Sequence, residues 1–149
     1  MYEIKIRMMN EEMANKLLVP LGLGRPKVEE TGTSTYLKDE EVTRKIKDVD
    51  GALTYVVAKR YGPGFTYVAE SITSEQRADL ESRYPPTITL TIQRTAWEVD
   101  GAGVELDRIA DTGVFLELHG EDFEQLKTLA RRIGFSEHHY LTRTYDELK

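Results

Sequence analysis

The chain has 149 residues, of which 40% are hydrophobic and 31% are charged, a composition typical of ordinary globular domains. Its formal net charge of −6 argues against a protein that binds duplex nucleic acid, because such proteins normally carry a basic balance. The absence of cysteine excludes disulfides, thiolate catalysis and Cys-based zinc sites.

The length fits one domain, so residues 1–149 are expected to fold as a single unit. The N-terminal sequence MYEIKIRMM lacks the apolar stretch of a signal peptide, and no run approaches ~18 apolar residues. We therefore expect a cytoplasmic protein without membrane or nucleic-acid partners, and either a monomer or a homodimer.

The N-terminal part predicts a strand followed by a helix. Residues 2–8 alternate polar and apolar side chains, as a half-buried strand does. Asn10 is the expected N-cap of a helix that continues to about Leu18, and Pro20 ends it. Residues 22–27, with two glycines and a proline, are expected to form a loop.

Short strands joined by turns dominate the rest of the chain. Asp50-Gly51 and Asp100-Gly101 are strong hairpin signals between alternating segments. The expected strands cover residues 33–37, 43–49, 53–59, 65–71, 87–99, 104–109 and 114–119.

Further helices are expected at residues 74–82, with Ser74 as N-cap, and at residues 121–133, with Gly134 at the C-cap. A short helical tail is expected at His138–Lys149. About eight strands in hairpin order with three or four helices predict an α+β domain built on an antiparallel sheet or barrel.

Charged side chains repeatedly share one face of these strands, because residues two apart point the same way. In the first strand Glu3, Lys5 and Arg7 lie on one face. The same spacing recurs in Lys45 and Lys47, Glu105 and Asp107, and Glu117 and His119. The opposite, apolar face is expected to pack under the helices, through Ile4, Ile6, Tyr55, Val57, Val104, Leu106, Leu116 and Leu118.

Two arrangements fit this charged face. In an open sheet it simply meets water. In a closed sheet it lines a lumen, where charges must be paired or must bind a ligand. Cations there could bind a multiply charged anion, and carboxylates could hold a divalent metal.

Several segments also occur in the order found in a known family. They are EIKI at 3–6, YLKD at 36–39, TRKIK at 43–47, VELDRIADTGVFLELHG at 104–120 and YLTRTYDEL at 140–148. Together they resemble the CYTH superfamily, the triphosphate tunnel metalloenzymes, which include class IV adenylate cyclases and thiamine triphosphatases. The resemblance implies an eight-stranded antiparallel β-tunnel (a closed barrel) with helices packed outside, holding a polyphosphate and Mg²⁺ or Mn²⁺.

The resemblance also implies roles for individual residues, with Lys5 and Glu117 as the catalytic pair. The expected phosphate ligands are Lys5, Lys45, Lys47, Lys59 and Arg94, and Arg7 extends them because it shares the face of Lys5. The expected metal ligands are Glu3, Asp107, Glu117 and His119, and Glu70 is expected to line the tunnel. Four family polar positions differ, at Met1, Val68, Ile92 and His119. Met1 and His119 replace carboxylates, which predicts weaker Mg²⁺ binding.

Three functions therefore remain open. The preferred one is a divalent-metal-dependent hydrolase that acts on an organic triphosphate or inorganic tripolyphosphate, with cyclisation of ATP as the alternative reaction. The second is a degenerate module that binds a nucleotide or phosphorylated small molecule without turnover. The third is a scaffold whose charged sheet face meets water.

Overall fold

The computed structural model describes residues 1–148 and contains eight strands and four α-helices. The strands are β1 (Tyr2–Met8), β2 (Val28–Leu37), β3 (Thr43–Val49), β4 (Ala52–Tyr61), β5 (Gly64–Ile72), β6 (Pro86–Val99), β7 (Ala102–Ile109) and β8 (Gly113–Gly120). The helices are α1 (Glu11–Leu18), α2 (Ser74–Arg83), α3 (Phe123–Arg132) and α4 (Tyr145–Leu148), with 3₁₀ turns at Val19–Leu21 and Glu137–His139. None of these helices combines the length and apolarity needed to cross a bilayer.

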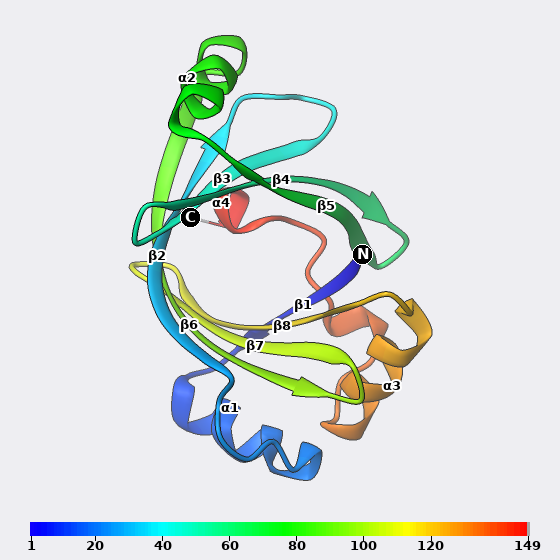
Figure 1. Ribbon diagram of the computed structural model, residues 1–149. Coiled ribbons are helices and arrows are strands. Elements are labelled where there is room, and N and C mark those ends of the chain that lie inside the picture. Colours follow the sequence, from blue (N-terminus) through cyan, green and yellow to red (C-terminus); the bar gives the residue numbers. More distant parts are fainter. Residues whose placement is uncertain (149) are drawn as a thin grey trace.

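The eight strands form a closed barrel in the order β1-β5-β4-β3-β2-β6-β7-β8 (Figure 1). Every neighbouring pair is antiparallel, and β1 closes the ring by pairing with β5 on one side and β8 on the other. The expected α+β tunnel is confirmed, and the open-sheet alternative is wrong.

The predicted Asp-Gly hairpins are also confirmed. Asp50 and Gly51 have φ of 51° and 85°, and Asp100 and Gly101 have φ of 51° and 82°. Two successive residues with positive φ match the twist of the flanking strands, which is why these dipeptides favour tight hairpins.

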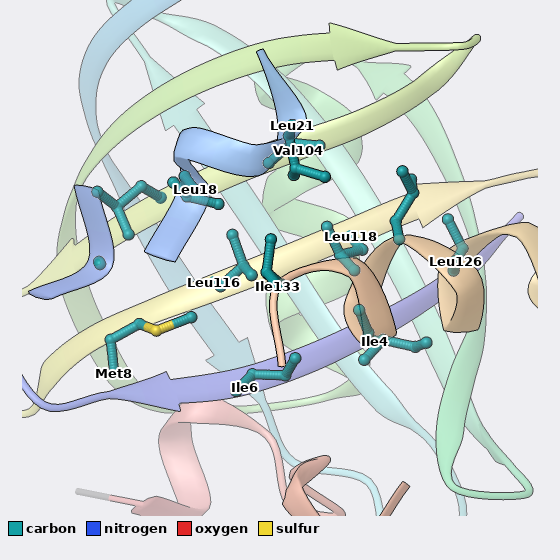
Figure 2. Close-up of a cluster of buried hydrophobic side chains, with 14 of the residues drawn as sticks. Ile4, Ile6, Met8, Leu18, Leu21, Val104, Leu116, Leu118, Leu126 and Ile133 are labelled. Atoms are coloured by element: carbon teal, nitrogen blue, oxygen red, sulfur yellow. The ribbon is translucent and has the colours of Figure 1, made fainter. Parts of the chain in front are cut away.

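The main hydrophobic core lies outside the barrel, between the strands and the helices. Figure 2 shows Ile4 of β1, Leu116 and Leu118 of β8, Leu18 of α1 and Leu126 of α3 packed in this cluster. A second outer cluster contains Tyr55 of β4 and Leu80 of α2. The apolar faces of the strands therefore point outward, as the sequence predicts, and the charged faces point into the barrel.

Most element ends lie within two residues of the prediction, and two of the differences have a clear physical reason. Strand β2 begins at Val28 rather than at Thr33, because the polar stretch before Thr33 pairs continuously with β6. Helix α2 is capped by Thr73 rather than by Ser74. The Thr73 side chain accepts a hydrogen bond from Gln76 N, and the Gln76 side chain accepts one from Thr73 N, which forms a capping box.

The tail does not form the continuous helix expected at His138–Lys149, of which Lys149 lies outside the described residues. A 3₁₀ turn at Glu137–His139 is followed by a non-helical stretch and then by the single turn of α4. Leu141 N donates a hydrogen bond to Lys5 O at 2.8 Å, so contacts with β1 replace the helical pattern.

Candidate functional site

The strand register decides which side chains enter the barrel, because directly paired residues lie on the same side of a sheet. Lys5 pairs with Glu117, and Arg94 pairs with Asp107. Alternation from these positions brings together inside the barrel Glu3, Lys5, Lys45, Lys47, Arg94, Glu105, Asp107, Glu117 and His119.

Lys5 is the centre of a buried ion-pair group. Its Nζ lies 3.2 Å from Glu3 Oε1 and 3.2 Å from Glu117 Oε2. Burial acts to lower the pKa of Lys5, but the charges of Glu117 and Glu3 outweigh it and raise that pKa. Burial raises the pKa of Glu3 to about 7, whereas Lys5 and Arg94 outweigh burial at Glu117 and hold its pKa well below the usual value. Glu117 is therefore the ionised partner of Lys5.

Arg94 neutralises two further carboxylates. Its Nε and Nη2 donate to Asp107 Oδ1 and Oδ2 at 2.8 and 2.9 Å, the bidentate geometry for which a guanidinium is suited. The same Nε lies 3.1 Å from Glu105 Oε2. Asp107 is completely buried, so this pairing is needed to keep its charge inside the barrel.

His119 belongs to the same group through Glu105. His119 Nε2 lies 2.9 Å from Glu105 Oε1, and although burial acts to lower the pKa of His119, Glu105 raises it overall. A Cβ on Gly103 would lie 2.2 Å from the His119 ring, so a glycine is required opposite this side chain. At position 119 the family pattern has a carboxylate. This chain instead has a histidine that pairs with the carboxylate of Glu105.

Three carboxylates meet closely enough to hold a metal ion: Glu105, Asp107 and Glu117 each offer an oxygen within 4.8 Å of the others. Carboxylate oxygens are the ligands that Mg²⁺ and Mn²⁺ prefer, so this set fits the expected ion. Asp107 and Glu117 were predicted as ligands. Glu105 was not among the predicted ligands, although its spacing from Asp107 puts both on one strand face. Glu3 and His119 lie outside this group, beside Lys5 and Glu105.

Lys45 differs from Lys5 and Arg94, the other buried cations of the barrel, because it has no carboxylate partner. Within residues 1–148 none lies within ion-pair distance of its Nζ, although the residue is only 8% exposed. Burial, and next the charge of Lys5, lower the pKa of Lys45 to about 8. An anion beside Lys45 would relieve this unfavourable charge.

Lys47 and Arg7 occupy the edges of the lumen. Lys47 is half-buried and lines a narrow pocket together with Arg94 and Ser34. Arg7 is exposed, and its guanidinium lies 5.1 Å from the centroid of the Phe115 ring. Both can add positive charge to the tunnel without being part of its packed interior.

The structure does not bring Lys59 and Glu70 into the tunnel, which corrects the prediction for both. Lys59 pairs with Thr66, and Glu70 pairs with Tyr55, a residue of the outer core. Both side chains are exposed. Side chains alternate along β4, and Lys59 follows Tyr55 by four residues, so both lie on the outer face. A shift of one residue in the strand register would have been needed to turn Lys59 inward.

A pocket of about 350 Å³ opens at one end of the barrel, between the loop after β2, the end of β4 and the C-terminal tail. Its lining includes Arg60, Phe65 and Tyr36. The centroid of the Tyr36 ring lies 5.8 Å from Lys45 Nζ, so one residue of the pocket lining is also a neighbour of the unpaired lysine.

Tyr145 is a site residue that the sequence reading did not identify. It is fully buried, and its hydroxyl donates toward Glu117 Oε2 at 2.8 Å and lies 3.2 Å from Asp107 Oδ2. Residues 144–148 stood out only as part of a family segment. Strand periodicity carries no signal for a side chain that enters the barrel from a tail.

Fold and site together define a closed β-tunnel with an ionic interior and a cluster of carboxylates. The CYTH domain model matches residues 2–145, and the chain belongs to the CYTH family. Members of this family bind nucleotide or triphosphate substrates and generally depend on a metal ion.

Solved structures support the fold. A conserved hypothetical protein from Pyrococcus furiosus superposes with a TM-score of 0.79 at 19% identity, covering 99% of each chain. A “putative adenylate cyclase” from Vibrio parahaemolyticus has a TM-score of 0.74 at 19% identity, covering 98% of this chain and 95% of its own. Another protein so described, from Bacillus halodurans, has a TM-score of 0.65 at 14% identity, covering 88% and 86%. No curated protein sequence matches the chain.

Proposed function

We propose that this protein is a divalent-metal-dependent hydrolase that cleaves a small triphosphate, organic or inorganic, inside its tunnel. The observation that carries the proposal is the convergence of Glu105, Asp107 and Glu117 in a closed barrel whose opposite wall presents the unpaired ammonium of Lys45. One end of such a site attracts a cation and the other attracts an anion, as a metal–polyphosphate complex requires.

The residues divide the work as follows. Lys45, Lys47 and Arg7 bind phosphate oxygens, because their charges are not consumed by carboxylates. A divalent ion held by Glu105, Asp107 and Glu117 would supply neutralisation of the charge on the phosphate oxygens. In this proposal the catalytic role of Lys5 is to keep Glu117 ionised and to hold its carboxylate in place.

Cyclisation of ATP is the alternative reaction of the same site. Two structural neighbours are described as “putative adenylate cyclases”, and the same cations would hold ATP by its phosphates. The two reactions differ in the nucleophile, which is water for hydrolysis and the ribose hydroxyl for cyclisation. The products therefore distinguish them.

A specific observation favours a second function, in which the tunnel binds a phosphorylated ligand without turnover. Each carboxylate of the cluster is already next to a cation of the chain: Glu117 to Lys5, and both Asp107 and Glu105 to Arg94. A metal ion would have to compete with these pairs. Anion binding at Lys45 needs no such exchange.

The test is an assay of tripolyphosphate, thiamine triphosphate and ATP with Mg²⁺ or Mn²⁺, with measurement of phosphate, pyrophosphate and cyclic AMP. We expect phosphate release that is lost in Glu117→Gln and retained in Glu70→Gln, the same substitution on the outer face of the barrel. Thermal stabilisation by a triphosphate without turnover would support the binding module instead. No turnover and no stabilisation would contradict both functions. The cytoplasmic location and the choice between monomer and homodimer stay predictions from the sequence.

A further inference from the structure

The C-terminal tail carries one side chain into the middle of the barrel. Arg60 Nη1 donates to Thr142 O at 2.9 Å and Leu141 N donates to Lys5 O at 2.8 Å, so the tail is held at the strands before it turns inward. Figure 1 shows α4 within the ring of strands. Tyr145, the first residue of α4, is 0% exposed.

The hydroxyl of Tyr145 joins two carboxylates of the candidate metal group. It donates to Glu117 Oε2 of β8 at 2.8 Å and lies 3.2 Å from Asp107 Oδ2 of β7. Its single proton is thus directed at the point where the two carboxylates approach each other. A hydrogen bond from a buried phenol to a carboxylate restricts the rotation of that carboxylate and stabilises its charge.

Packing explains the ring of Tyr145 but does not explain its hydroxyl. The ring centroid lies 4.8 Å from that of Phe115 and 4.5 Å from Lys5 Nζ, and a phenylalanine would make both contacts. Tyr140, in the same tail, provides the contrast. It is 5% exposed, and its hydroxyl has no hydrogen-bond partner in the described part of the chain.

We infer that Tyr145 is a positioning residue for the metal site: its hydroxyl fixes the carboxylates of Glu117 and Asp107 so that their oxygens converge with that of Glu105. The inference rests on the proposed function, because the oriented carboxylates are those assigned to the metal. Groups that hydrogen-bond to metal-ligating residues set the geometry of those ligands, and removing such a group typically weakens metal binding by about 10–100-fold.

The experiment compares Tyr145→Phe with Tyr140→Phe in the full chain. Binding of Mn²⁺ is measured from the electron paramagnetic resonance signal of the free ion, and circular dichroism confirms that each variant is folded. We expect Tyr145→Phe to bind Mn²⁺ at least about 10-fold more weakly than the wild type, and Tyr140→Phe to stay within about twofold. Unchanged or tighter Mn²⁺ binding by Tyr145→Phe would overturn the inference and leave the proposed function standing.

A crystal structure of Tyr145→Phe separates this inference from the proposed function. If the wild type binds no Mn²⁺, the metal-dependent hydrolase is contradicted, and the structure of the variant still decides the role of Tyr145. Displaced carboxylates at Glu117 and Asp107, with the rest of the barrel unchanged, support positioning by the hydroxyl. Carboxylates in their original places would contradict it.

Discussion

Lys5 and Lys45 are both buried in the same tunnel, yet their pKa values move in opposite directions. Lys5 lies between Glu3 and Glu117, whose charges raise its pKa. At Lys45, burial and the charge of Lys5 outweigh the opposing charges of Glu117 and Glu3, and its pKa falls to about 8. The difference depends on the wall to which each belongs, because β1 adjoins the carboxylate-bearing β8 whereas β3 lies between β2 and β4.

This contrast divides the interior into two parts with different tasks. In the wall formed by β1, β6, β7 and β8, Lys5, Arg94 and His119 each have a carboxylate partner. The wall formed by β3 keeps a cation that a ligand can use. Binding sites need such unsatisfied groups, and the fold must tolerate their free-energy cost. Four substitutions or conditions test the division, starting with the largest expected effect.

Removing the paired lysine should have the largest effect on stability. Lys5→Met leaves Glu3 and Glu117 buried without their cation, and breaking a buried pair in this way costs about 3–5 kcal/mol. Urea unfolding at pH 7 measures the loss. The matched control is Lys59→Met on the outer face, for which we expect a change within about 0.5 kcal/mol. Equal losses in the two variants would remove the distinction between inner and outer lysines.

The pH dependence of the free energy of unfolding should reveal the titration of Glu3. Its pKa is about 7 in the folded protein against an ordinary 4.5, so the folded state binds more protons than the unfolded state between these values. Its stabilising contribution is fully present below pH 4.5 and is lost as the pH rises through about 7, by at most about 3 kcal/mol. Unfolding free energies at several pH values should show this decline in the wild type and a smaller one in Glu3→Gln. The same decline in both proteins would assign it to another group.

Adding a methyl group at Gly103, which faces His119 inside the barrel, should destabilise the protein. In Gly103→Ala the new Cβ would lie 2.2 Å from the His119 ring, which must move away from Glu105, and we expect a loss of about 1–3 kcal/mol. The His119→Ala background removes the clash, so adding Gly103→Ala there should cost much less. A double-mutant cycle of unfolding free energies measures this coupling, and strictly additive losses would contradict the packing described.

Replacing Lys45 should have the smallest effect on the free energy of unfolding. Unlike the other substitutions, it should leave the protein equally stable or make it more stable. Lys45→Met replaces a buried ammonium of lowered pKa by an apolar side chain, so the free energy of unfolding at pH 7 should stay unchanged or rise by up to about 2 kcal/mol. Urea unfolding measures it beside Lys5→Met. A loss as large as that of Lys5→Met would show that Lys45 has a stabilising partner.

Much of the fold could be predicted from the sequence because alternation and turn chemistry are local. Ile4 and Ile6 indicate which face of β1 meets the helices, and Asp-Gly pairs mark hairpins. Closure of the ring came from the family resemblance, since no local pattern distinguishes an open sheet from a barrel. The start of β2 at Val28 was missed because pairing with β6 stabilises a stretch that contains Glu29, Glu30 and Gly32, residue types that do not favour strands.

The site was predictable only where the strand face was read correctly. Lys5, Asp107 and Glu117 were found by alternation together with the family pattern. Lys59 was placed inside although it shares its face with Tyr55, which packs in the outer core. Tyr145 could not be found in this way, because its position depends on how the tail crosses the end of the barrel.

The most direct test of the account is calorimetric titration of tripolyphosphate into the wild type, Lys45→Met and Lys16→Met at pH 7, where Lys16 is an exposed lysine of the outer helix α1. The account predicts that the wild type and Lys16→Met bind alike and that Lys45→Met binds at least about 10-fold more weakly, since a charge-assisted contact is worth about 1.5–3 kcal/mol. Equal affinity in all three proteins, or no binding in any of them, would contradict the claim that the tunnel holds a polyphosphate against its unpaired lysine.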